Sequence, residues 1–90
     1  MNKNNITQER TERIQEKLQT ALSPSILNIL DESAQHHGHA AASTGLGYFA
    51  ITISSPLFTG KSLVECHRLV YQALGDMMQT DIHALRIIIQ

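Results

Sequence analysis

Cysteine and aromatic residues are scarce in this 90-residue chain, which has one cysteine, Cys66, and no tryptophan. A single thiol cannot form an intrachain disulfide or a cysteine-only metal site, so the chain is not a disulfide-stapled secreted scaffold. We therefore expect a reducing compartment and a cytoplasmic location. Aromatic residues make up only 4% of the chain, which is few for the stacking platforms of single-strand nucleic-acid binders.

The sequence also has no long apolar run and no excess of charge of one sign. Because no run approaches the roughly 18 residues of a membrane span, and the N-terminus lacks the apolar segment of a signal peptide, we expect no membrane association. Seven Lys and Arg side chains against eight Asp and Glu give a net charge of −1, so no overall positive field attracts nucleic acid. The length and the 42% hydrophobic content predict a single domain over residues 1–90.

A helix is predicted near the start of the chain. Apolar side chains recur every fourth residue from Ile14 to Leu22, which is the spacing of one helix face. Thr7 is a suitable N-cap, so we expect the helix to begin there. It should end at Leu22, because the residue before Pro24 is disfavoured in the helical conformation. The polar residues 1–5 are expected to be disordered.

Two strands and a long connection are predicted next. The short apolar run over 26–30 is typical of a strand, and strict alternation of apolar and small polar residues over 49–54 indicates a second one. Between them, residues 34–47 are rich in Gly, Ala, Ser and His and lack periodicity. This composition predicts a long mobile loop, of a length that in a small domain is usually functional.

A second helix and a final strand are predicted in the last third of the chain. Ser62 and Glu65 fit a capping box, in which each side chain binds a backbone N–H of the other residue. Gly75 should weaken or end this helix, residues 76–80 form a further short helical turn, and 83–89 form the last strand. The predicted core-facing residues of the helix are Leu63, His67, Val70, Leu74 and Met77.

The predicted order is therefore helix, strand, strand, helix, short helix, strand. A long hairpin makes the first two strands antiparallel, whereas a helical crossover allows the second and third to lie parallel. The expected fold is α+β, with a three-stranded mixed sheet covered by helices on one face.

Several short motifs, in this order along the chain, carry a resemblance to a known family. They are Asp31-Glu32-Ser33, Phe58-Thr59-Gly60-Lys61, Cys66-His67-Arg68-Leu69-Val70-Tyr71 and Ile82-His83-Ala84-Leu85. In these motifs the chain resembles the BolA family over about residues 14–89. The resemblance implies a fold of the class II KH type, in agreement with the predicted order of elements.

The resemblance also implies a non-enzymatic role as an adaptor that partners a monothiol glutaredoxin and shares a 2Fe-2S cluster with it. In such pairs the family supplies the histidine equivalent to His83 and a second ligand from the loop between the first two strands. The glutaredoxin contributes a thiolate and its bound glutathione. The alternative role that the resemblance implies is a DNA-binding regulator of transcription in stress and cell shape.

The second cluster ligand is open, because Tyr48 stands where many family members have the loop histidine. His37 or His39 of the cluster His36-His37-Gly38-His39 is the candidate to replace it. Three loop histidines do not match the spacing of a closed zinc site, and a solvated polar loop is the alternative interpretation. For His83 the alternative is a histidine that merely caps its strand.

The DNA-binding alternative depends on a local patch formed by Lys61, His67, Arg68 and Arg86. Three permanent charges are few, and binding that depends on them should weaken steeply with salt. Relatives often have arginine at the position of Cys66, and the G-x-x-G clamp of KH modules is missing. We expect His67 to be mostly buried, Cys66 to be a semi-buried structural thiol, and Lys61, Arg68 and Arg86 to be either the patch or a solvated surface.

An enzyme is the least favoured class. The sequence shows no nucleophile beside a base, no paired carboxylates in an apolar setting and no phosphate-binding loop. We expect no cofactor in the isolated chain, and a monomer or a weak homodimer.

Overall fold

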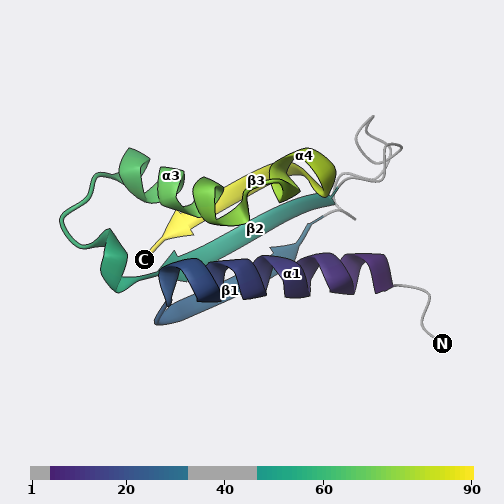
Figure 1. The fold of residues 1–90 in the computed structure, drawn as a ribbon, viewed down its shortest axis with the longest axis horizontal. Helices are drawn as coiled ribbons and strands as arrows, with labels where there is room; N and C mark the ends of the chain where they lie inside the picture. Colours follow the sequence, from purple (N-terminus) through teal and green to yellow (C-terminus); the bar gives the residue numbers. More distant parts are fainter. Residues whose placement is uncertain (1–4, 33–46) are drawn as a thin grey trace.

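The computed structural model describes residues 5–32 and 47–90, which form three strands, three α-helices and one 3-10 turn. Figure 1 shows the sheet behind two long helices that lie side by side on one of its faces. The predicted α+β fold with a mixed sheet and helices on one face is thus confirmed. The elements in chain order are α1 (Asn5–Leu22), β1 (Ile26–Asp31), β2 (Gly47–Ser54), η2 (Pro56–Phe58), α3 (Leu63–Leu74), α4 (Met77–Thr80) and β3 (Ile82–Ile89).

Helix α1 begins two residues before the predicted start, so Thr7 lies inside the helix and the prediction of an N-cap there is wrong. The end of the helix at Leu22 is confirmed. Ser23 adopts a left-handed conformation with φ of 45°, and the Ser55 hydroxyl donates a hydrogen bond of 2.6 Å to the Leu22 carbonyl. These two features end the helix at Leu22, in agreement with the steric restriction that disfavours the helical conformation for Ser23, the residue before Pro24.

The sheet has the order β1-β2-β3, with β2 antiparallel to β1 and parallel to β3. Alternation sends odd-numbered residues of β2, and of β3 after His83, toward the helices and even-numbered residues to the opposite, open face. Ile82, which lies before a shift in the register, also faces the core. Phe49, Ile51 and Ile53 of β2 are therefore the centre of the core, with at most 1% exposure each. Ile14 and Leu18 of α1 pack over them and are fully buried.

The strands are slightly longer than the sequence predicts. β1 continues to Asp31, β3 starts at Ile82, and β2 starts at Gly47 rather than at Phe49. Apart from Gly47, the predicted loop of residues 34–47 lies outside the described residues. Of residues 1–5, which are predicted to be disordered, 1–4 lie outside the described residues and Asn5 is the first residue of α1. None of the helices within 5–32 and 47–90 combines the length and the apolar character needed to cross a membrane.

The capping box of α3 is confirmed, but its predicted core face is partly wrong. The Ser62 Oγ accepts from the Glu65 N–H at 3.1 Å, and the Glu65 carboxylate accepts from the Ser62 N–H at 2.9 Å. Leu63, however, is 61% exposed, and the fully packed face is Cys66, Val70 and Leu74. The face is rotated because the small apolar thiol of Cys66, rather than the Leu63 side chain, faces the sheet.

Candidate functional site at the start of strand β3

His83 lies at a break in the pairing between β2 and β3. Gly47 pairs with Ile82 and Tyr48 pairs with Ala84, so His83 is an extra residue on β3 with no partner on β2. An extra residue of this kind, a β-bulge, turns the local side chains away from their regular directions and is often found beside functional sites. The side chain of His83 is exposed, whereas its neighbour Ile82 is 1% exposed. The bulge therefore presents an imidazole to solvent at the end of the sheet.

The aromatic ring of Tyr48 contacts this imidazole. The two ring centroids are 5.2 Å apart with an angle of 62° between the ring planes, which is an edge-to-face arrangement. Tyr48 is only 8% exposed. One side of the imidazole thus has a fixed aromatic neighbour, and Tyr48 occupies the position where the resemblance led us to look for a loop histidine.

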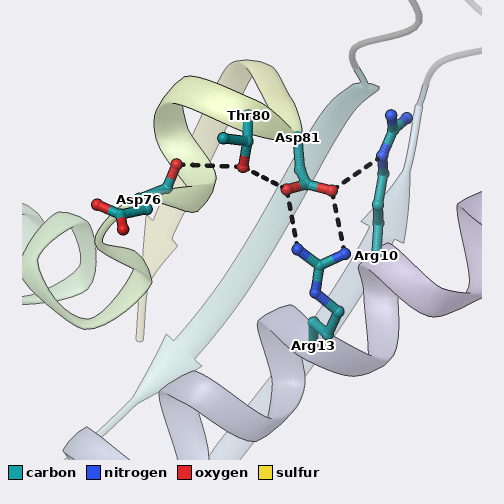
Figure 2. Close-up of polar contacts among 5 residues, drawn as sticks. All are labelled: Arg10, Arg13, Asp76, Thr80 and Asp81. Atoms are coloured by element: carbon teal, nitrogen blue, oxygen red, sulfur yellow. Dashed lines mark hydrogen bonds and ion pairs between the residues drawn. The ribbon is translucent and has the colours of Figure 1, made fainter.

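Asp81, two residues before His83, is bound by side chains of two helices (Figure 2). The Arg13 guanidinium donates to both carboxylate oxygens, at 2.9 and 3.1 Å, and the Nε of Arg10 lies 3.4 Å from Oδ2. The Thr80 hydroxyl donates a further hydrogen bond to Oδ1. Burial raises the pKa of Asp81, but the hydrogen bonds from Thr80 and Arg13, the charge of Arg13 and the hydrogen bond from Arg10 together outweigh it. The pKa is therefore lowered from its usual value, and the carboxylate is charged at neutral pH.

The backbone of Asp81 is held as well. Its carbonyl accepts a hydrogen bond of 3.0 Å from the Gly47 N–H, and its own N–H donates to the Met77 carbonyl at 2.9 Å. Contacts from α1, α4 and β2 therefore converge on the residue that leads into β3. The backbone two residues before the exposed imidazole of His83 is therefore held in place.

Glu32 and Arg86 form an ion pair on the open face of the sheet, 2.6 Å between the Arg86 Nη2 and the Glu32 Oε2. Glu32 follows β1 and Arg86 belongs to β3, so the pair spans the central strand. Both residues line a cavity of about 250 Å³ together with Tyr48, Phe49, Ala84 and Leu85. The site at the start of β3 thus consists of an exposed histidine, a buried aromatic ring and a flanking ion pair.

The family model described as BolA-like protein matches residues 18–90. The chain belongs to the BolA family. It is 44% identical over 81 residues to SufE-like protein 1, chloroplastic/mitochondrial, of Arabidopsis thaliana, covering 84% of this chain and 22% of that protein. It is 36% identical over 76 residues to the DNA-binding transcriptional regulator BolA of Escherichia coli, covering 84% of this chain and 70% of the relative.

Solved structures of BolA domains have the same fold. The BolA domain of SufE1 from Arabidopsis thaliana matches with a TM-score of 0.78 and 42% identity, covering 90% of each chain. BolA1 from the same plant matches with a TM-score of 0.77 and 42% identity, covering 90% of this chain and 89% of the other. The predicted family is confirmed. Because some relatives are named as chloroplastic, the cytoplasmic location stays a prediction.

The residues predicted to bind a metal are only partly among the described ones. Within residues 5–32 and 47–90, no three His, Cys, Asp or Glu side chains come together in a way that could hold a metal ion. The loop histidines His36, His37 and His39 lie outside the described residues. The described donor set fits a single imidazole offered to a metal that other ligands already hold, and it does not fit a self-contained metal site.

His67 and Cys66 of the BolA-like domain lie away from this arrangement, on α3. His67 is half-buried, less than the predicted mostly buried histidine, because the core face of α3 is centred on Cys66. The Cys66 thiol is 3% exposed, and its Sγ lies 4.0 Å from the Phe58 carbonyl oxygen. It is a packed structural thiol, more deeply buried than the sequence predicts.

The basic residues named for a nucleic-acid patch are spread over the domain. Arg68 is exposed on α3, which covers the helix face of the sheet, whereas Arg86 is an even-numbered residue on the open face and is paired with Glu32. Lys61 is exposed in the segment before α3. Lys61 and Arg68 remain as two exposed cations, both near enough to Glu65 to help lower its pKa, and Arg86 is not part of one patch with them.

Sequence analysis missed the residues that support His83. Asp81, Arg10 and Arg13 come from segments 68 and 71 residues apart, and nothing in the local pattern links them. The available signal was the spacing of Arg10 and Arg13, which places two guanidinium groups on one side of a helix that also carries the apolar stripe. An acidic partner across that face was a reasonable expectation.

Proposed function

We propose that this BolA-like chain is a non-enzymatic adaptor that binds a monothiol glutaredoxin and offers His83 to a 2Fe-2S cluster that the partner carries. The single observation that supports this function best is the exposed imidazole at a β-bulge, standing on a strand start that α1, α4 and β2 hold in place. The proposed role is in iron homeostasis or in the transfer of iron–sulfur clusters.

The chemistry of the donor supports this role. A neutral imidazole binds iron, and histidines replace cysteines on one iron of Rieske-type clusters. One exposed nitrogen donor can complete the coordination of a metal held by thiolates elsewhere, but it cannot retain a cluster alone. The described residues of this chain fit that division, because they offer one exposed imidazole, that of His83, and no accessible thiol, Cys66 being buried.

The second ligand in this proposal is His37 or His39 from the segment before β2. Strand β2 begins at Gly47 and pairs with the start of β3, so the segment enters the sheet beside His83. Tyr48, the residue at the place usual for the loop histidine, makes a ring contact to His83. The described end of that segment, Gly47, is therefore paired directly with the start of β3.

The test uses a monothiol glutaredoxin loaded with its 2Fe-2S cluster, titrated with this chain under anaerobic conditions. We expect the visible absorption and circular dichroism of the cluster to change on addition of the wild-type chain. His83→Ala should abolish the change, and His67→Ala, which removes a half-buried imidazole on α3, should leave it intact. An unaltered spectrum with the wild type, or a change that survives His83→Ala, contradicts the proposal. His37→Ala and His39→Ala then identify the second ligand.

A second candidate function is regulation of transcription by binding duplex DNA, because a relative from Escherichia coli is named as a DNA-binding transcriptional regulator. The exposed pair Lys61 and Arg68 would then contact phosphates, with His67 beside them. Binding should weaken with salt and should weaken further in Lys61→Ala and Arg68→Ala. Affinity for duplex DNA that is no greater than the non-specific level at moderate salt removes this candidate.

A further inference from the structure

We propose that Tyr48 is a positioning residue for His83, which holds the imidazole by its aromatic ring and stands at the position where the family resemblance led us to expect a histidine ligand. This inference deepens the proposed function and rests on it only in the claim that the orientation of His83 matters for metal binding. The contact between the two rings stands independently of any partner.

The first argument is the contrast in burial between the two rings. Tyr48 is 8% exposed and is part of the central strand, whereas His83 is exposed on an edge strand at a bulge. An exposed side chain on an irregular backbone samples several rotamers, and the free energy of binding must include the entropy lost when one is selected. A fixed ring 5.2 Å away, edge to face, removes part of that freedom before any ligand arrives.

The second argument is that Tyr48 is itself held on several sides. Its carbonyl accepts a hydrogen bond of 2.8 Å from the Glu32 N–H, and it pairs with Ala84 of β3. Tyr48, Ala84 and Arg86 are even-numbered residues that share the open face, where Tyr48 and the Glu32–Arg86 pair line one cavity. The backbone of Tyr48 is thus held from both neighbouring segments, and the residue is only 8% exposed.

The third argument concerns the chemistry of the side chain. A phenol O–H is a weaker iron ligand than an imidazole nitrogen, which has a free lone pair. Replacement of histidine by tyrosine therefore exchanges a ligand for a ring of similar reach and greater apolar area. If the ring is what matters, phenylalanine should serve as well as tyrosine, and an aliphatic side chain should not.

The first experiment is NMR spectroscopy of the chain alone. In the wild type we expect nuclear Overhauser effects between the ring protons of Tyr48 and His83, and ring-current displacement of the His83 imidazole proton signals. Tyr48→Phe should keep the displacement, and Tyr48→Leu should lose it. Tyr71→Leu, which removes a tyrosine that is 41% exposed on α3, is the matched control and should leave the His83 signals unchanged.

The second experiment repeats the glutaredoxin titration with the same variants. We expect Tyr48→Leu to raise the concentration needed for the half-maximal spectral change by about 2- to 10-fold, the range that one aromatic pair contact implies. Tyr48→Phe should stay within about twofold of the wild type.

The outcomes separate this inference from the proposed function. If the wild type leaves the cluster spectrum unchanged, the proposed function fails, and the NMR arm still decides whether Tyr48 positions His83. If Tyr48→Leu leaves both the imidazole signals and the midpoint unchanged, or if the two rings show no Overhauser effect in the wild type, the inference is overturned. The wild-type Overhauser measurement keeps the test decisive even where Tyr48→Leu fails to fold.

Discussion

Asp81 and His83 are two residues apart on the chain and differ in almost every physical respect. Asp81 is 8% exposed and accepts hydrogen bonds from three side chains, whereas His83 is exposed and contacts the aromatic ring of Tyr48. Asp81 stabilises the fold, whereas the side chain of His83 is accessible from solvent. The difference teaches that an exposed donor can be both accessible and well placed when the residues just before it are fixed.

The largest effect on stability is expected when the carboxylate of Asp81 is removed. Asp81→Ala leaves the guanidinium groups of Arg10 and Arg13 without their carboxylate partner. The Asp81 side chain is well buried, with 12% exposure. We expect a loss of roughly 2–4 kcal/mol in the free energy of unfolding, measured with urea. Asp76→Ala, which removes an exposed carboxylate without a side-chain cap bond, is the control and should cost less than about 0.5 kcal/mol. Equal losses in the two variants would contradict the central role of Asp81.

The second expectation concerns pH. Because the pKa of Asp81 is lowered in the folded state, its contribution to stability is present above the pKa of the unfolded chain and is lost as the pH falls through the folded value. The free energy of unfolding should therefore decrease from about pH 6 toward about pH 3, and less steeply in Asp81→Asn. Glu65, whose pKa is also lowered, mainly by hydrogen bonds from the Ser62 backbone and side chain, contributes in the same range. Only the difference between wild type and Asp81→Asn thus reports on Asp81, and parallel pH profiles would refute the assignment.

The third expectation compares the site with the distant end of α3. Ser62→Ala removes the hydrogen bond that the Glu65 N–H donates at 3.1 Å and should cost about 1 kcal/mol, measured by urea unfolding. The NMR signals of His83 should be unchanged in this variant, because the cap contacts neither α4 nor the start of β3. Displaced His83 signals in Ser62→Ala would mean that general destabilisation, rather than local support, controls the imidazole.

The order of elements and the pairing of strands were predictable because they depend on local patterns. Alternation over 49–54 and the capping box at Ser62 are short-range signals, and the structure confirms both. The core face of α3 was predicted only in part: Val70 and Leu74 are buried as expected, but Cys66 packs as a small apolar side chain while Leu63 stays exposed. Such a rotation by less than one turn depends on how the helix lies across the sheet, which periodicity alone does not determine.

The site was predictable only in part, for a related reason. His83 was found through a motif, but its support comes from residues far away in the chain. The hydrogen bonds from Arg13 to Asp81 join residues 68 positions apart, and the contact of Tyr48 with His83 depends on the bulge in β3. Long-range ion pairs and a one-residue shift of register have no short-range signal, so sequence reasoning named the donor and missed what positions it.

A smaller effect is expected at the ion pair on the open face. Arg86→Met removes one partner of a contact of 2.6 Å in which the arginine side chain is 59% exposed. Exposed pairs contribute little, so we expect a loss below about 1 kcal/mol in urea unfolding. Arg68→Met, an exposed arginine on α3, is the control. A loss as large as that of Asp81→Ala would show that Glu32 and Arg86 support the fold as strongly as the cluster at Asp81.

The smallest effect on stability is expected for His83→Ala, the same variant that should abolish the spectral change of the cluster. The imidazole is exposed and lies at a bulge, so its removal should change the free energy of unfolding by less than about 0.5 kcal/mol. The comparison with Asp81→Ala in one urea series checks this directly. A loss above about 1 kcal/mol would support the alternative that His83 merely caps its strand, because a side chain held for a partner contributes little to folding. Unchanged stability together with a lost cluster signal would assign His83 to cluster binding and leave the stabilisation of the fold to Asp81.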